Sequence, residues 1–383
     1  MIISLLYKLF KPKEQKQNSS TSTPHIPHGI LLNILSRVPA PSLLRFKPVN
    51  RAWYSLISSE ELRRRHLQHH VKRLDQTYGT IQVGHTHTLY PSLSLRIMSN
   101  IHIDDHQLVE IQRIYGEVSY GYYLRPQLLG SCNGLLLISL SPYLSSFILW
   151  NPTIREHRII DRQITNRSDM CMAGLGYNSL NDDYKIVVAE FSNLQNNSIQ
   201  VQIYNLKESS WKTIKCDNFP YKFISFTTPA ASLVNGIPHW HVKRINNGQG
   251  VVISFDLAEE KFEEIDLPEN ILDFTCMSAL DGCLCIGIRK YFWHPIYVWK
   301  MRDYGIKKSW FKLKFSLHTE IGGENYLMPL GFLQKDLVVA NFDRVIIAIF
   351  NVITQQNKFI MGSGHRPYFT VAAFIETFVE VHD

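Results

Sequence analysis

The stretch HIPHGILLNILSRVPAPSLLRFKPVNRAWYSLISS (residues 25–59) contains three short helical patterns separated by prolines. In the first, apolar residues recur at spacings of one, three and four, which places them on one face of a helix that ends near Pro39. A short apolar turn follows and ends before Pro48, and the third pattern begins after Asn50, a favoured helix-capping residue. Three helices of about ten residues each cannot bury this much apolar surface among themselves. The sequence therefore predicts that a partner or the rest of the chain covers part of it.

The same stretch resembles the F-box. The resemblance covers residues 26–59 and rests on the Ile-Pro start, the helix end ILSRVP, the turn SLLRFKPV and the final WYSLISS. Gly29 and Pro48 depart from the usual pattern. An F-box implies binding to an SKP-type or ASK-type adaptor, and through it to a cullin scaffold. The resemblance implies these adaptor-binding residues: Pro27, Ile30, Leu31, Ile34, Leu35, Pro39, Leu43, Leu44, Phe46, Val49, Trp53, Leu56 and Ile57.

Composition favours a globular protein with one large and one small domain. The chain has 383 residues, of which 45% are hydrophobic, and no apolar run approaches the roughly 20 residues that span a bilayer. Residues 1–24 are predicted to be a flexible tail, and their lysines follow the apolar part, which argues against a secretory signal. The six cysteines lie scattered in apolar stretches. This distribution favours reduced thiols and a cytoplasmic or nuclear protein.

Positive charge is concentrated near the N-terminus. Residues 1–75 hold 13 Lys or Arg against 4 acids, whereas the remainder holds 27 against 29. The run Arg63-Arg64-Arg65 lacks the interleaved aromatic residues and fold motifs of a nucleic-acid site, so no nucleic-acid partner is expected. Two interpretations remain open: the run complements an acidic adaptor surface, or it is a solvated face after the third helix.

From about residue 75 the helical period gives way to short alternating strands with Asn-Gly and Asp-Gly turns. Three segments of similar pattern start at residues 148, 202 and 253. They align the aromatic residues Trp150, Tyr204 and Phe255, and again His157, Trp211 and Phe262. A period near 50 residues with about four strands is typical of a β-propeller blade. The aligned aromatics are therefore expected to lie in the cores of the blades.

The order of the repeats resembles the plant F-box-associated domain, often called the F-box/kelch-repeat type. The matching pieces run from GSCNGLLLI at 130–138 to VWKMRDYGIKKSWFKL at 298–313. The resemblance implies a small all-α F-box of three helices at residues 25–70. It also implies an all-β, propeller-like domain of about six blades at residues 75–383.

Several residues invite a chemical interpretation. His85 and His87, and the cluster His102, Asp104, Asp105 and His106, could hold a metal in principle, but neither has the spacing of a known ligand motif. Cys132 lies in a turn-like GSCNG run with no base beside it in the sequence. We therefore expect no catalytic residue, no metal and no cofactor.

Two elements are candidates for contacting a target protein. His239 and His241 flank Trp240 and share one side of a predicted strand, with Trp240 in the core. The loop RKYFWHP combines cations, aromatics and a proline, a composition favoured at protein-binding surfaces. From it we select Arg289, Tyr291, Trp293 and His294.

The sequence thus predicts the substrate-recognition subunit of an SCF ubiquitin ligase, a receptor without catalytic groups of its own. Two alternatives stay open. One is a propeller enzyme with a helical cap, which requires acids, tyrosines or histidines converging at the propeller mouth. The other is an F-box receptor for glycans, which requires exposed Trp or Tyr platforms beside Asn and Asp.

Overall fold

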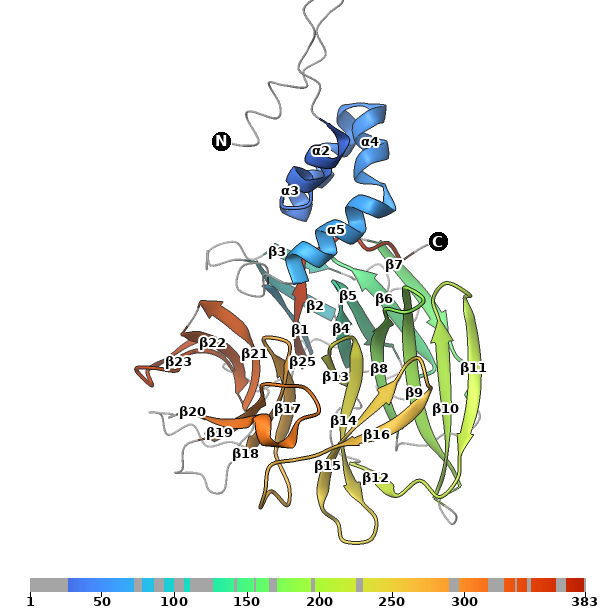
Figure 1. The fold of residues 1–383 in the computed structure, drawn as a ribbon, viewed down its shortest axis with the longest axis vertical. Coiled ribbons are helices and arrows are strands. Elements are labelled where there is room, and N and C mark those ends of the chain that lie inside the picture. The colour runs from blue at the N-terminus through green and yellow to red at the C-terminus, as the bar shows by residue number, and fades with distance from the viewer. Residues whose placement is uncertain are drawn as a thin grey trace, which may run out of the picture.

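The structure is a computed structural model in which helices gather at one end and strands form the rest (Figure 1). It describes residues 27–71, 78–85, 93–99, 107–110, 127–140, 143–154, 156–164, 171–193, 197–224, 230–288, 296–315, 327–334, 336–342, 346–362 and 370–381.

The N-terminal region has four α-helices and a 3-10 helix, where the sequence predicted three helices. They are α2 (His28–Leu35), α3 (Ala40–Leu44), η1 (Lys47–Val49), α4 (Arg51–Ile57) and α5 (Glu60–Val71). The prediction missed α5, which the sequence presented only as a charged run. Ser59 Oγ accepts a hydrogen bond from Leu62 N at 3.3 Å, and two glutamates occupy the first turn. Both features stabilise the start of this helix.

The remaining chain is an all-β propeller. Five blades are built from consecutive strands, and blade 1 contains β4 (Gln127–Cys132), β5 (Leu135–Ser139), β6 (Ser146–Asn151) and β7 (Glu156–Asp161). Blade 2 contains β8 (Cys171–Asn178), β9 (Asp183–Asn193), β10 (Ser198–Asn205) and β11 (Ser210–Cys216), and blade 3 contains β12 (Tyr221–Phe223), β13 (Ser232–Val234), β14 (Ile237–Arg244), β15 (Gly250–Asp256) and β16 (Lys261–Ile265). Blade 4 contains β17 (Cys276–Leu280), β18 (Cys283–Ile288), β19 (Ile296–Met301) and β20 (Trp310–Phe315), and blade 5 contains β21 (Leu327–Gln334), β22 (Leu337–Phe342), β23 (Ile346–Asn351) and β24 (Asn357–Gly362). In blade 4 a 3-10 helix, η2 (Lys307–Ser309), precedes β20.

A composite sheet completes the ring. It joins β1 (Tyr78–His85), β2 (Leu93–Ser99) and β3 (Gln107–Glu110) to β25 (Thr370–Ile375), which pairs with β1. Strand β25 also contacts β4 on one side and β21 on the other. About six blades were expected from the repeats, and the structure corrects this number to five blades of consecutive strands. The sheet beside them is a composite, because β25 comes from the end of the chain and β1–β3 precede the first blade.

The strand register agrees with the repeat alignment. Trp150 pairs with His157, Tyr204 with Trp211 and Phe255 with Phe262 across the hairpins of blades 1, 2 and 3. Trp150, Tyr204 and Phe255 are buried. Trp211 and Phe262 are half-buried and His157 is exposed. The prediction of blade-core positions is therefore confirmed for the first aligned set only.

The Asn-Gly and Asp-Gly turns are tight hairpins that require left-handed backbone. At Asn133 and Gly134 the φ angles are 51° and 88°, and at Asp281 and Gly282 they are 54° and 67°. Asparagine, aspartate and glycine tolerate positive φ at both central positions, which suits the twist of the flanking strands.

Candidate functional site

The thirteen residues predicted to bind an adaptor fall into three groups by exposure. Four are buried in the core of the helical region: Leu35, Leu43, Trp53 and Ile57. Five are half-buried: Leu31, Ile34, Leu44, Phe46 and Leu56. Four are exposed: Pro27, Ile30, Pro39 and Val49. This corrects the expectation that all thirteen offer surface to a partner, because the four buried residues stabilise the helical region itself.

Three large apolar side chains of the helical region remain exposed. Ile30 on α2 is 54% exposed, Val49 at the end of η1 is 38% and Tyr54 on α4 is 58%. Tyr54 was not predicted, although it follows the buried Trp53 by one residue and so lies about 100° further around the helix. These side chains form the exposed apolar part of a candidate adaptor surface, which we call the docking triad (Ile30, Val49 and Tyr54).

Local sequence explains how the docking triad is held. The side chain of Asn50 caps α4 by accepting a hydrogen bond from Trp53 N at 2.9 Å, as predicted. Pro48 sits in the first turn of η1, where no intrahelical donor is needed. A Cβ at Gly29 would meet nothing within 4 Å, so no close contact requires glycine at this position.

The segment that carries the docking triad is basic. Arg37, Arg45 and Arg51 are exposed, and the Lys47 ammonium lies 5.8 Å from the centre of the Tyr54 ring. No acidic residue occurs between residues 27 and 59. An acidic partner surface would therefore be attracted to this side of the molecule.

The last described residues, 376–381, pass between α5 and blade 1, and we call them the C-terminal strap. Phe378 is buried in the core of the helical region, with its ring 4.7 Å from that of His66 on α5. Glu380 forms an ion pair with Arg63 at 2.6 Å. The strap therefore completes the helical core and attaches it to the propeller. No sequence pattern indicated this role, because Phe378 lies more than 300 residues from the helices it contacts.

Blade 1 holds the other side of the C-terminal strap. The amide of Asn151 donates hydrogen bonds to the backbone carbonyls of Thr377 at 3.2 Å and Val379 at 2.8 Å. The Thr377 hydroxyl donates to Asn133 O at 2.8 Å. A Cβ at Gly134 would come within 2.2 Å of that hydroxyl oxygen, so glycine is required there for the close approach as well as for the turn.

His239 does not face a target, which corrects the prediction. Its side chain is fully buried, with Nδ1 2.9 Å from Ile237 O and Nε2 2.7 Å from the Tyr304 hydroxyl. Since a carbonyl only accepts, Nδ1 donates and Nε2 accepts from the tyrosine. Burial lowers the pKa of His239 to about 4. This histidine is therefore a neutral core residue that links blade 3 to the β19–β20 loop.

His241 is half-buried and already engaged. Its ring stacks on Phe274 with centroids 3.7 Å apart, and Nε2 lies 3.1 Å from Asp273 Oδ1. Burial acts to raise the pKa of Asp273, but hydrogen bonds from His241 and Lys243 outweigh it and lower that pKa well below its ordinary value. Trp240 is buried, as predicted. The other candidates for target contact, Arg289, Tyr291, Trp293 and His294, lie outside the described residues.

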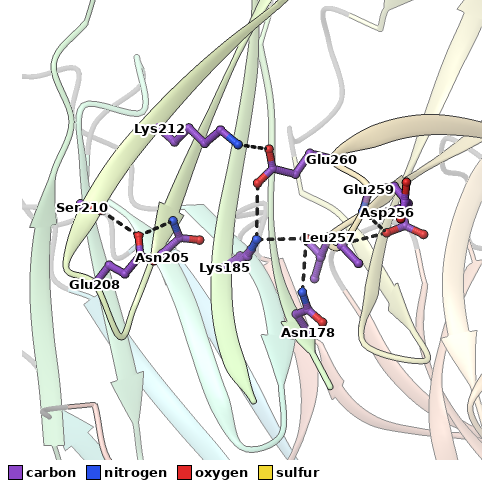
Figure 2. A network of polar contacts seen from close by, with 11 residues as sticks. Asn178, Lys185, Asn205, Glu208, Ser210, Lys212, Asp256, Leu257, Glu259 and Glu260 are labelled. Carbon is purple, nitrogen blue, oxygen red and sulfur yellow. Dashed lines mark hydrogen bonds and ion pairs between the residues drawn. The ribbon is translucent and has the colours of Figure 1, made fainter. Parts of the chain in front are cut away.

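Charged side chains inside the propeller hold blades together. Lys185 is buried, and its ammonium lies 3.0 Å from Leu257 O and 3.6 Å from Glu260, which also pairs with Lys212 (Figure 2). This network joins blade 2 to the β15–β16 turn of blade 3. Because each buried charge has partners, the network is structural rather than reactive.

A second buried ion pair joins blades 1 and 2. Arg162 and Glu190 lie 3.2 Å apart with almost no exposed side-chain surface. The guanidinium also donates to Leu144 O at 2.8 Å and to Gln202. Neither group faces an open surface that a substrate could reach.

The structure describes only some of the residues that were considered for metal binding or catalysis. No group of three or more His, Cys, Asp or Glu that could hold a metal occurs among the described residues. Cys132 is buried in β4, and burial raises the pKa of its thiol, which suppresses the thiolate. The side chain of His85 and the residues His87 and 102–106 are not among those described.

No helix within the described ranges is both long and apolar enough to cross a membrane.

Two stretches match known families. Residues 23–69 match the family described as F-box-like, and residues 94–376 match the F-box associated beta propeller domain. The helical region and the ring of blades thus define an F-box protein with a β-propeller. Because the second match spans well over half of the chain, the protein belongs to the family of F-box associated β-propeller domains.

Relatives from Arabidopsis thaliana match this chain over most of their length. The F-box/kelch-repeat protein At3g23880 is 27% identical over 382 residues, covering 94% of this chain and 97% of the relative. F-box protein CPR1 is 27% identical over 340 residues, covering 81% and 78%. F-box protein At3g07870 is 27% identical over 328 residues, covering 77% and 73%.

Proposed function

We propose that this protein is the substrate receptor of an SCF ubiquitin ligase. The helical region binds an SKP-type adaptor, which connects it to a cullin scaffold, and the propeller holds the target protein. The observation that carries the proposal is the F-box-like match at residues 23–69, combined with the exposure of Ile30, Val49 and Tyr54 on that region. This role places the protein in the cytoplasm, the nucleus or both.

The mechanism is positioning. A target lysine held near a ubiquitin-charged conjugating enzyme reacts at a high effective concentration, so the receptor needs no catalytic group. Positioning requires a defined distance between the adaptor surface and the target surface. The C-terminal strap supports this requirement, because it contacts both α5 and blade 1.

The test is co-expression with an SKP-type adaptor and co-purification. The substitutions Ile30→Asp and Val49→Asp, made together, place charges on two exposed residues and should abolish co-purification without unfolding the chain. Leu35 is unsuitable for this purpose, because it is fully buried and a charge there would break the helical core.

The matched control is Leu272→Asp with Ile353→Asp, which changes two propeller side chains that are 75% and 69% exposed. This variant should bind the adaptor as the unaltered protein does. If the unaltered protein does not co-purify with the adaptor, the proposed function is wrong.

A further inference from the structure

The β19–β20 hairpin of blade 4 (residues 296–315) is strongly basic. Six of its residues are Lys or Arg, and Asp303 is its one acid. The equivalent hairpin of blade 3 (residues 250–266) has the opposite balance, with six acids and only Lys261 as a cation. Two hairpins with the same structural role in adjacent blades therefore carry opposite charge.

Three of the six acids of the blade 3 hairpin form ion pairs with nearby cations. Glu260 pairs with Lys185 and Lys212, and Glu263 pairs with Lys261 at 3.2 Å. Glu264 pairs with Arg244. Half of the acids of this hairpin are thus paired with cations within the fold.

Most cations of the blade 4 hairpin form no ion pair with an acid among the described residues. Lys300 is buried and pairs with Asp281 at 3.2 Å. The other five are exposed, and none forms an ion pair with an acid in the described part of the chain; they are Arg302, Lys307, Lys308, Lys312 and Lys314. We call these five the blade 4 cations. Uncompensated charge on one element creates a field that attracts a partner of opposite sign.

Aromatic side chains lie among these cations. In the register of the hairpin Tyr297 faces Lys314 and Trp299 faces Lys312. The Lys312 ammonium lies 3.7 Å from the centre of the Tyr297 ring and 5.8 Å from that of Trp299. Lys312 and Lys314 point to one side of β20 about 7 Å apart, a spacing that lets successive carboxylates meet both.

The tip of the hairpin adds apolar surface. Ile306 is 55% exposed and Tyr304 is 36% exposed, directly before Lys307 and Lys308. Large apolar side chains beside cations are the composition of protein-binding surfaces.

The tip also lies on the side of the ring that carries the helices. Each blade is an antiparallel meander, so the turns between first and second strands and between third and fourth strands emerge on one face. The β6–β7 turn after Asn151 is of the second kind and lies beside the C-terminal strap. The β19–β20 turn is of the same kind in blade 4.

We propose that the β19–β20 hairpin docks an acidic segment of the target protein, with the blade 4 cations binding its carboxylates and Ile306 and Tyr304 packing against its apolar residues. This inference rests on the proposed function, since it names the chemistry of the target. A protein segment fits better than a nucleic acid, because Lys312 covers the Tyr297 ring that would otherwise be available for stacking on a base.

The test measures binding of the full chain, co-purified with its adaptor, to a fluorescent eight-residue peptide of alternating glutamate and phenylalanine. Lys312→Glu with Lys314→Glu should weaken binding by about tenfold or more. The control, Lys215→Glu with Lys222→Glu, makes the same charge change at two exposed lysines of blades 2 and 3 and should change binding by less than about twofold.

Equal losses in both variants, or no loss in either, overturn the proposal, because binding would then follow net charge or another surface. A single-stranded oligouridylate of equal charge is tested alongside the peptide. Binding of the oligouridylate but not of the peptide also overturns it. Both variants should still co-purify with the adaptor, so a failure of the adaptor experiment is seen separately from a failure here.

Discussion

The helical region and the propeller complete their cores in different ways. In the propeller, each third-strand aromatic pairs with a residue of its own hairpin, as Tyr204 does with Trp211. In the helical region, the core includes Phe378, a residue from the opposite end of the chain. The blade cores are built from pairs within one hairpin, whereas the helical core of this protein includes a side chain from a distant segment.

This difference indicates that the helical region and the propeller are not independent modules. Strand β25 closes the ring by pairing with β1 and leads directly into the C-terminal strap. The same short stretch therefore closes the propeller and fills the helical core. Substitutions in the C-terminal strap and in β25 test how far the stability of the helical region depends on this stretch.

The largest effect is expected from Phe378→Ala. Phe378 is 3% exposed, and removing a buried aromatic side chain costs about 3–5 kcal/mol. The loss should fall on the helical region, seen as faster amide hydrogen exchange in α2–α5 with little change in blades 2–4.

Phe374→Ala is the matched control. Phe374 is 2% exposed and lies four residues earlier, in β25 opposite Gly79. This variant should loosen the β1–β25 seam first. If Phe378→Ala leaves exchange in the helices unchanged, the helical region is autonomous and the comparison fails.

The contrast also explains what the sequence could predict. The repeats predicted the blade-core positions of Trp150, Tyr204 and Phe255, because these aromatics pair within local hairpins. In residues 25–59 the spacing identified apolar faces but not what covers them. Leu35 and Leu43 are therefore buried, although they were expected to face a partner.

Contacts between distant segments account for the other differences. Alternation correctly placed His239 and His241 on one side of β14. His239 is nevertheless buried and contacts Tyr304, from the next blade, and no pattern near His239 reveals that neighbour. Helix α5 was missed because its run of charged residues hides Leu62, whose side chain is fully buried.

A smaller, pH-dependent effect is expected in the propeller. Burial lowers the pKa of His239 from 6.5 to about 4. Between these pH values the unfolded state therefore binds a proton at this histidine more readily than the folded state does. Stability from this residue is complete above pH 6.5 and is lost as the pH falls toward 4, by about 3 kcal/mol at most. Urea unfolding followed by tryptophan fluorescence at several pH values measures this slope.

His239→Gln removes the titrating group and is the comparison variant. Its stability should fall less steeply than that of the unaltered protein between pH 6.5 and 4, whatever its stability at pH 7. Parallel slopes for the two proteins would mean that His239 is accessible to protons in the folded state, contrary to its burial.

The smallest effect is expected from the ion pair that joins α5 to the C-terminal strap. Arg63 and Glu380 lie 2.6 Å apart with side chains 25% and 29% exposed, so a double-mutant cycle with alanine should give a coupling of about 0.5–1 kcal/mol. The pair Arg65–Glu61, within α5 and 42% and 45% exposed, is the control and should give about 0.3–0.5 kcal/mol. The first coupling should decrease less than the second at high salt, because its charges are more buried. Equal couplings with equal salt dependence would mean that the strap is held by Phe378 and backbone hydrogen bonds alone, and that its charges contribute nothing beyond an ordinary surface pair.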